Sequence, residues 1–331
     1  MFSATNYLTG IKHPEGFHGK HKSNNFFEGW YIKLVSPDQS QKWAVIPGIF
    51  RGLQGSEVHE AFVQVLNGST GESWYHRFPI TEFEAASDRF EVRVGDNEFS
   101  PKRIKLNLEQ LRGELRIASE LKPWPVTLAS PGIMGWYGLV PMMECFHGIV
   151  SFGHSLAGEL EVLGKKESFE KGRGYIEKDW GKNFPAGYLW LHSNHLENDQ
   201  EASLVSSAAI IPWVGSSFRG FITGFNHSGK LFSWTTYNKA KEIKLEITDQ
   251  QIEWVLDGPS GRLEVFAIRK RGGLLHAPLR DQMHQRVEET MDASIEIRHE
   301  LSGKLLKAGT MSSGAMEVYG DIDRLLKIGK R

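Results

Sequence analysis

Residues 89–97 read RFEVRVGDN, and this stretch indicates the class of fold. Phe90, Val92 and Val94 alternate with charged residues, and a Gly-Asp-Asn cluster follows at once. A period of two residues is typical of a strand with one buried face, whereas clustered Gly, Asp and Asn are typical of turns. The stretch therefore predicts a half-buried strand that ends in a tight turn.

The same alternation recurs along the chain, in segments separated by glycine-rich links. Helical periodicity is scarce, because only residues 279–290 and 321–329 have the pattern of a short helix. These observations predict an all-β protein of antiparallel strands with few short helices. The alternating segments are 90–94, 104–108, 115–117, 243–247 and 252–256, and the clearest links are 226–229 and 257–261.

The polar, glycine-rich segment 164–174, GKKESFEKGRG, separates two β-rich halves of similar length. The chain has 331 residues, of which 40% are hydrophobic, so each half is large enough to bury a core of its own. We therefore predict two β-barrels or β-sandwiches in tandem, an N-terminal domain of residues 1–163 and a C-terminal domain of residues 164–331.

Charge and cysteine content exclude several classes of function. Lys and Arg number 39 against 40 Asp and Glu, and no basic stripe indicates nucleic acid as a partner. The single cysteine, Cys145, cannot form an intrachain disulfide, which favours a reducing compartment. The first residues lack the pattern of a signal peptide, and no run of about 20 apolar residues is present. We expect a cytoplasmic protein, with peripheral membrane contact and oligomeric state left open.

Several familiar motifs are incomplete. Residues 153–158, GHSLAG, resemble the turn that carries a nucleophilic serine. Ala157 stands where this motif requires glycine, and the required strand-turn-helix context is absent from the sequence pattern. Residues 224–230 match the spacing of a phosphate-binding loop, yet Leu231 replaces its Ser or Thr, so we predict a hairpin there. The histidines have no convincing ligand spacing, so no metal site is predicted.

Residues 174–185, GYIEKDWGKNFP, place acids among aromatic side chains. If this segment is extended, Tyr175, Glu177 and Asp179 share one face, and Lys178 lies on the other. Two carboxylates on one face raise each other's pKa. A solvated ladder, in which Lys178 forms a salt bridge with a neighbouring strand, is the alternative interpretation.

Residues 136–151, WYGLVPMMECFHGIVS, place Glu144 and His147 among aromatic and sulfur-containing side chains. Burying a carboxylate or an imidazole there costs several kcal/mol unless the group is paired or neutralised. Such groups are either satisfied structural partners or functional ones, and the sequence leaves both open.

Two of these stretches, together with a third near the start of the chain, resemble the signature blocks of the tocopherol cyclase family: FFEGWYIK (26–33), residues 136–151, and GYIEKDWGKNFPAGYLWLHSN (174–194). APLRDQM (277–283) and SSGAMEVYG (312–320) are also similar to the family. The resemblance implies lipocalin-like tandem β-barrels and ring closure of a prenylated phenol or quinol to a chromanol, with no cofactor. Such a reaction needs a buried general acid and aromatic faces that stabilise a tertiary carbocation.

At the positions that match the family's signature blocks, the resemblance implies four catalytic residues and a set of residues that contact an apolar substrate. Glu177 or Asp179 would be the proton donor, and Glu28 and His147 would complete the catalytic set. The family usually has Asn at the position of Asp179, differs near His192 and carries a plastid transit peptide. The implied substrate-binding residues are Trp30, Tyr31, Trp136, Glu144, Tyr175, Trp180, Trp190 and Asn194.

Two other functions agree with the same residues. A lipocalin-like carrier would bind an apolar ligand without changing it, and Glu177 and Asp179 would then face solvent or form salt bridges. A hydratase or isomerase of a terpenoid would use the same acid with water as the nucleophile. The sequence does not choose between phenol and water.

Overall fold

The computed structural model describes the chain except for residues 1–12, 128–129, 131, 141–142, 280 and 329–331. Strands account for 62% of the structure and helices for 6%, so the all-β prediction is confirmed. Contacts divide the chain into two compact units. The first comprises Met1–Asn67, Glu72–Phe184 and Leu275–Arg286, and the second comprises Gly68–Gly71, Pro185–Leu274 and Val287–Arg331.

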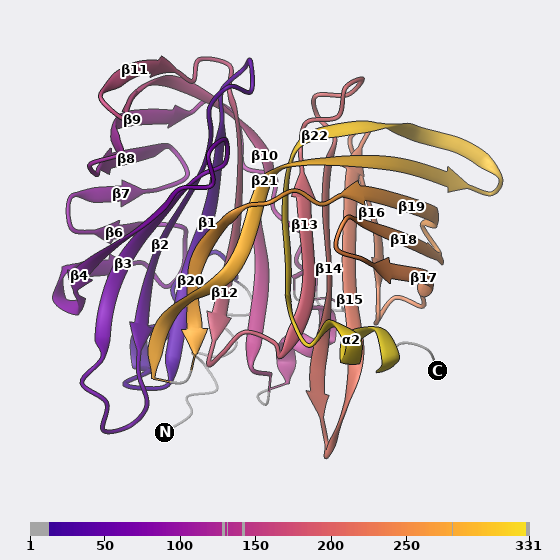
Figure 1. Ribbon diagram of the computed structural model, residues 1–331, viewed down its shortest axis with the longest axis horizontal. Coiled ribbons are helices and arrows are strands. Elements are labelled where there is room, and N and C mark those ends of the chain that lie inside the picture. Colours follow the sequence, from indigo (N-terminus) through magenta and orange to yellow (C-terminus); the bar gives the residue numbers. More distant parts are fainter. Residues whose placement is uncertain (1–12, 128–129, 131, 141–142, 280, 329–331) are drawn as a thin grey trace. The chain divides into compact units, whose positions relative to one another are not determined.

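The first unit contains an antiparallel sheet of order β4-β3-β2-β1-β12-β10-β9-β8-β7-β6-β5, with β11 paired to β10 (Figure 1). Its strands are β1 (Phe26–Val35), β2 (Lys42–Arg51), β3 (His59–Asn67), β4 (Ser73–Pro79), β5 (Phe83–Ala85), β6 (Val92–Val94), β7 (Asn97–Phe99), β8 (Arg103–Asn107), β9 (Leu111–Ile117), β10 (Cys145–Val162), β11 (Lys165–Ser168) and β12 (Arg173–Gly181). Short 3₁₀ helices cover Gly19–His21 (η1), Ile80–Glu82 (η2) and Gly135–Leu139 (η3).

The sheet of the first unit curls over its own core. Strand β6 packs against β2 and β3, although it lies near the other end of the sheet order. The enclosed cluster takes Trp30 from β1, Trp43 from β2 and Val92 from β6, together with Ile104 from β8. Because large side chains fill this interior, the concave face is a packed core.

The second sheet has the order β16-β15-β14-β13-β22-β21-β19-β18-β17, with β20 paired to β21, and belongs to the second unit except for the part of β20 and β21 within Leu275–Arg286. Trp234 and Trp254 lie fully buried in its core. Its strands are β13 (Gly187–Ser193), β14 (Ser203–Trp213), β15 (Ser216–His227), β16 (Lys230–Thr235), β17 (Lys241–Ile247), β18 (Gln251–Gly258), β19 (Gly261–Ile268), β20 (Gly273–Leu279), β21 (Gln282–Leu301) and β22 (Lys304–Gly320).

Two expectations about local structure had different outcomes. Helix α2 (Ile322–Ile328) confirms the predicted C-terminal helix. The helix predicted for residues 279–290 is wrong, because its described residues belong to strands β20 and β21 and to the turn at Asp281 between them. Strand β20 pairs with β21, and Glu289 and Thr290 of β21 pair with β22, so strand pairing overrides a weak local helical pattern. No helix among the described residues is long and apolar enough to cross a membrane.

The boundary between the units also differs from the sequence-based boundary at residues 163/164. Strand β11 pairs with β10, and β12 pairs with both β1 and β10, so residues 165–181 belong to the first sheet. The division therefore falls after Phe184. The polar segment 164–174 is a hairpin within the first unit rather than a linker.

Core burial predicts a large difference between two isoleucines that both lie on strands. Ile104 on β8 is fully buried, whereas Ile243 on β17 is exposed. Ile104→Ala should lower the free energy of unfolding by about 2–5 kcal/mol, because it removes buried methyl groups and leaves a cavity. Ile243→Ala should change it by less than about 0.5 kcal/mol. Urea denaturation of both variants measures the difference, and equal losses would contradict the assigned core.

Candidate active site

Strand β12 lies between β1 and β10 and carries the acidic motif. Its register places Glu177 opposite Tyr31 of β1, and Asp179 opposite His147 of β10. Since side chains alternate along a strand and direct partners share a face, Tyr31, Tyr175, Glu177, Asp179 and His147 all project from one face. The face shared by Tyr175, Glu177 and Asp179 agrees with the alternation expected from the sequence.

His147 joins the two carboxylates on this face. Its Nδ1 lies 2.9 Å from Oδ1 of Asp179, and its Nε2 lies 3.8 Å from Oε2 of Glu177. The hydroxyl of Tyr175 donates a hydrogen bond to Oε2 of Glu177. The rings of Tyr31 and Tyr175 lie edge to face, with centroids 6.4 Å apart. We call Tyr31, His147, Tyr175, Glu177 and Asp179 the acid cluster.

Burial and charge determine where the protons lie in the acid cluster. The side chains of Glu177, His147 and Asp179 are 5%, 13% and 27% exposed, respectively. Burial lowers the pKa of His147, but Asp179 and Glu177 more than offset this effect and raise it to about 9. Burial and the neighbouring Glu177 raise the pKa of Tyr175 well above its usual value. At neutral pH, His147 is an imidazolium and Tyr175 is a neutral donor.

One donor of this cluster is not satisfied. The Nε2 atom of His147 is buried and has no hydrogen-bond partner in the described part of the chain. Glu177 Oε2, at 3.8 Å, is near enough for electrostatic attraction but too far for a hydrogen bond. A protonated imidazole has two N–H donors, and Nδ1 is already directed to Asp179. Nε2 is therefore available to another group.

An apolar cluster borders these polar groups on the same face. Phe27, Phe50, Phe62 and Met283 pack together, with Cys145 and Phe184 against them. Phe27 precedes Tyr31 on the same side of β1, and Cys145 precedes His147 on the same side of β10. Burial raises the pKa of the Cys145 thiol, and Asp179 and Glu177 raise it further. The acid cluster therefore lies beside a cluster of buried apolar side chains.

The same three charged groups have the composition of a cation site. His147, Glu177 and Asp179 each offer a ligand atom, and these atoms lie within 4.8 Å of one another. A divalent cation would require a neutral imidazole. Binding through Nδ1 of His147 would break the hydrogen bond to Asp179, whereas binding through Nε2 would keep it. A metal and the proton on His147 therefore compete for one position.

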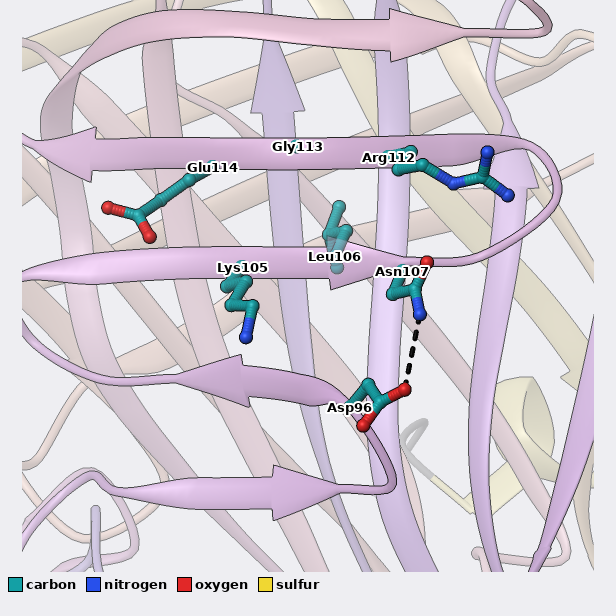
Figure 2. Close-up of a pocket in the computed structure, with 7 residues that line it drawn as sticks. All are labelled: Asp96, Lys105, Leu106, Asn107, Arg112, Gly113 and Glu114. Atoms are coloured by element: carbon teal, nitrogen blue, oxygen red, sulfur yellow. Dashed lines mark hydrogen bonds between the residues drawn. The ribbon is translucent and has the colours of Figure 1, made fainter.

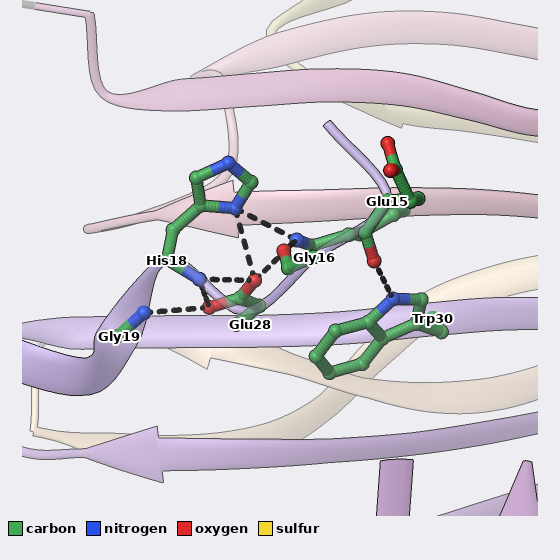
Figure 3. Close-up of polar contacts among 7 residues, drawn as sticks. Glu15, Gly16, His18, Gly19, Glu28 and Trp30 are labelled. Carbon is green, nitrogen blue, oxygen red and sulfur yellow. Dashed lines mark hydrogen bonds and ion pairs between the residues drawn. The ribbon is translucent and has the colours of Figure 1, made fainter. Parts of the chain in front are cut away.

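Glu28 and Trp30 lie with Trp180 on the face of the sheet opposite Glu177 and Asp179, so the expectation that Glu28 completes a catalytic set with these two acids is wrong. Both oxygens of Glu28 accept hydrogen bonds from the backbone N–H of His18, at 3.0 Å, and one accepts another from Gly19 (Figure 3). The β1–β12 register pairs Glu28 with Trp180, which puts them on the side of the packed core. Successive side chains on a strand point to opposite faces, so Glu28 lies on one side of the sheet and Glu177 and Asp179 lie on the other.

Lys178 is the counter-ion of Glu28, and both side chains are fully buried. The Lys178 ammonium also donates to the carbonyl of Gly16 and lies 4.8 Å from the ring centres of Trp30 and Trp180. Burial lowers the pKa of Lys178 to about 8 despite the attraction of Glu28. Burial opposes ionisation of Glu28, but Lys178 and His18 hold its pKa below the usual value. This network ties the segment before β1 to the core.

Four other residues expected in the site lie elsewhere. Trp136 on η3 is 43% exposed and stacks on Tyr137. Glu144 is exposed and immediately precedes β10. Trp190 on β13 and Asn194 just after it belong to the second unit. The acid cluster of the first unit contains none of these four.

The sequence reasoning missed the apolar residues beside the acid cluster. Phe27 and Tyr31 alternate in FFEGWYIK, so this part of the signal was present in the sequence. Phe50, Phe62 and Met283 come from distant segments, and no local pattern relates them to Glu177.

A surface hollow of about 450 Å³ lies away from the acid cluster, over strands β8 and β9 (Figure 2). Asn107 donates a hydrogen bond to Asp96 across it, at 3.2 Å. Its mixed charges do not suit an apolar ligand. The lining residues are Asp96, Lys105, Leu106, Asn107, Arg112, Gly113 and Glu114.

Comparison with known proteins agrees with the resemblance of the signature blocks. Residues 117–320 match the family described as tocopherol cyclase-like. The chain belongs to this family. A probable chloroplastic tocopherol cyclase from Oryza sativa subsp. japonica is 20% identical over 92% of this chain and 77% of its own length. At this identity, the family assignment rests on the match to residues 117–320.

Solved structures support the fold of this family member. CghA in complex with Sch210972 has a TM-score of 0.56 at 11% identity, covering 89% of this chain and 88% of its own. Kievitone hydratase from Nectria haematococca has a TM-score of 0.51 at 12% identity, covering 96% and 93%. These likenesses confirm the lipocalin-like, all-β fold.

The Glu28–Lys178 ion pair should stabilise the folded state. Lys178→Met leaves Glu28 buried without its counter-ion and should lower the free energy of unfolding by about 3–5 kcal/mol. The double variant Lys178→Met/Glu28→Gln should recover part of this loss, because it removes both charges. Chemical denaturation of the two single variants and the double variant measures the coupling. Additive losses would show that the two charges do not interact.

The ionisation of His147 predicts how stability depends on pH. Its pKa is about 9 in the folded chain and about 6.5 when unfolded, so the folded state binds the proton more tightly. The stabilisation, on the order of 3 kcal/mol, is fully present below pH 6.5 and is lost as pH rises through 9. His147→Gln should flatten this decline. Denaturation between pH 6 and 10, together with ¹⁵N NMR of the imidazole, tests it, and an imidazole pKa at or below 6.5 contradicts it.

Proposed function

We propose that the protein is an acid-catalysed cyclase that adds a phenol oxygen across a double bond of a prenylated phenol or quinol. Membership of the tocopherol cyclase-like family, and a fold shared with a hydratase, support an enzyme of the cyclase or hydratase type. The observation that carries the proposal is the buried, unsatisfied Nε2 of His147, which lies 3.8 Å from Glu177 beside a cluster of buried apolar side chains.

Before the reaction, the proton resides on His147, because the pKa of this imidazole is about 9. An apolar substrate that binds at the acid cluster, beside the buried Phe27 and Phe62, excludes water from this face. Loss of water disfavours a charged pair relative to its neutral form. The proton then moves from Nε2 of His147 to Glu177, which becomes a carboxylic acid beside the substrate.

Glu177 then protonates one carbon of the double bond and leaves a tertiary carbocation on the other. The aromatic faces of Tyr31 and Tyr175 stabilise this charge in the water-free site. The phenol oxygen bonds to the cationic carbon, and the phenol proton passes to Nε2 of His147. This step closes the ring and restores imidazolium and carboxylate, so no proton is gained or lost.

Asp179 and Tyr175 orient the two proton-carrying groups. Asp179 fixes the imidazole through Nδ1, which directs Nε2 towards Glu177. The hydroxyl of Tyr175 donates a hydrogen bond to Oε2 of Glu177 and so fixes the orientation of this carboxyl group. Both groups are therefore preorganised before the substrate binds.

A hydratase is the second candidate, and the exposure of Asp179 favours it. This side chain is 27% exposed, so water can reach the edge of the acid cluster. The same protonation by Glu177 followed by attack of water would give a tertiary alcohol. Chromatography distinguishes the two products from one substrate, because the alcohol gains the mass of water and the ring-closed product does not.

Glu177→Gln should cripple the enzyme. The amide keeps the size of the side chain but cannot deliver a proton, so conversion of a prenylated quinol should fall about 100-fold or more. Product formation by chromatography, with a melting curve for each variant, is the measurement. Glu144→Gln is the matched control, because Glu144 is an exposed acid near the same strand, and it should retain full activity.

Asp179→Asn provides a second, graded test. The amide still accepts the hydrogen bond from His147 but lacks the charge that raises the imidazole pKa. We expect less than a tenfold loss of activity at neutral pH, and the decline of the rate at alkaline pH should begin at a lower pH.

Assays with and without a chelator show whether turnover depends on a metal ion or on proton transfer alone. Tight binding of the quinol without turnover by the parent protein would favour the carrier.

A further inference from the structure

The hairpin of β14 and β15 is longer than the strands beside it. Strand β13 pairs with β14 only as far as Ala209, and β16 pairs with β15 only from Ile222 onward. From the Ile210–Arg219 pair to the Trp213–Ser216 pair, the two strands hydrogen-bond only to each other in the described sheet. Figure 1 shows this end of the hairpin extending past β13 and β16. We call residues 210–219 the projecting hairpin.

The projecting hairpin presents apolar side chains on one side. No charged residue or histidine occurs between Glu201 and Arg219. Ile211 lies opposite Phe218, and the ring of Trp213 meets that of Phe218 edge to face at 5.9 Å. Val214 at the turn is 78% exposed, more than any other large apolar side chain that the structure describes.

Such a surface is costly in water and invites aggregation. Proteins usually protect exposed hairpins with charges or prolines, particularly Lys. Here one proline, Pro212, is present, but the turn itself is Trp213-Val214-Gly215-Ser216. Tryptophan is enriched where an apolar region meets a polar one, as at the surface of a bilayer. This composition suits a lipid interface.

Positive charge lies at the base of the projecting hairpin, on α2. The guanidinium of Arg324 donates a hydrogen bond to the hydroxyl of Ser217, at 2.9 Å, and is exposed. Lys327, one turn further along α2, is also exposed. Arg219 anchors the base of the hairpin by donating to the carbonyl of Leu325, at 2.9 Å. Apolar side chains at the tip and cations behind them complement the acyl region and the anionic headgroups of a bilayer.

We propose that the projecting hairpin docks the protein on a lipid surface, with Trp213 and Val214 inserted among the lipids and Arg324 and Lys327 against anionic headgroups. The geometry of the hairpin carries this inference, and it holds whichever reaction the acid cluster performs. A prenylated quinol of the kind proposed as substrate dissolves in the same lipid phase.

Cosedimentation of the full-length protein with vesicles tests the proposal. The parent protein should bind vesicles of phosphatidylcholine with 30% phosphatidylglycerol, and brominated lipids should quench part of its tryptophan fluorescence. Trp213→Ser/Val214→Ser should lower the bound fraction at least tenfold and abolish that quenching. The matched control is Leu163→Ser, since Leu163 is an exposed apolar residue at the β10–β11 turn, and it should bind as the parent does.

The charge at the base is tested separately. Arg324→Gln/Lys327→Gln should weaken binding to anionic vesicles about tenfold and leave binding to pure phosphatidylcholine unchanged. Failure of the parent to bind either vesicle, or equal binding by Trp213→Ser/Val214→Ser, would overturn the proposal. A parent dimer that this variant converts to a monomer, without vesicle binding by the parent, would also overturn it and identify a second copy as the occupant. Quinol turnover by each variant in detergent reports the proposed reaction independently.

Discussion

The pairing of β12 with β1 on one side and β10 on the other is the constraint on which the candidate site depends. It places three consecutive charged residues in two different environments. Glu177 and Asp179 face His147, whereas Lys178 points into the packed core and meets Glu28. A slip of one residue in this pairing would bury the acid pair in the core and expose the lysine.

The two charged clusters differ in how completely their polar atoms are satisfied. Both oxygens of Glu28 accept backbone N–H groups, and Lys178 is held by Glu28 and by the carbonyl of Gly16. A fully paired buried network of this kind rigidifies a fold. His147 instead retains a buried Nε2 without a partner, next to Glu177. An unsatisfied donor beside buried apolar side chains is costly unless it serves a ligand, and this difference supports the proposal that the Glu28–Lys178 network is structural and the acid cluster catalytic.

The acid cluster does not lie in the curled interior of the first unit. Trp30, Trp43 and Phe99 fill the interior of the curled sheet in the first unit. The acid cluster and the apolar cluster around Phe27 lie on the opposite face of the strands. The packed interior supports the sheet, and the chemistry proposed here uses its other surface.

The sequence by itself determined the class of fold and the face shared by Tyr175, Glu177 and Asp179, because alternation of side chains is a local property of every strand. It did not determine that Glu28 faces the core, that His147 meets Asp179, or that residues 282–290 form a strand. Those outcomes depend on which strands pair and in which register, and pairing joins residues far apart in the chain. The projecting hairpin has the same cause, since its exposure follows from where β13 and β16 stop pairing. Only the tertiary structure decided these features, because hydrogen bonding between distant strands sets register, and no local pattern encodes it.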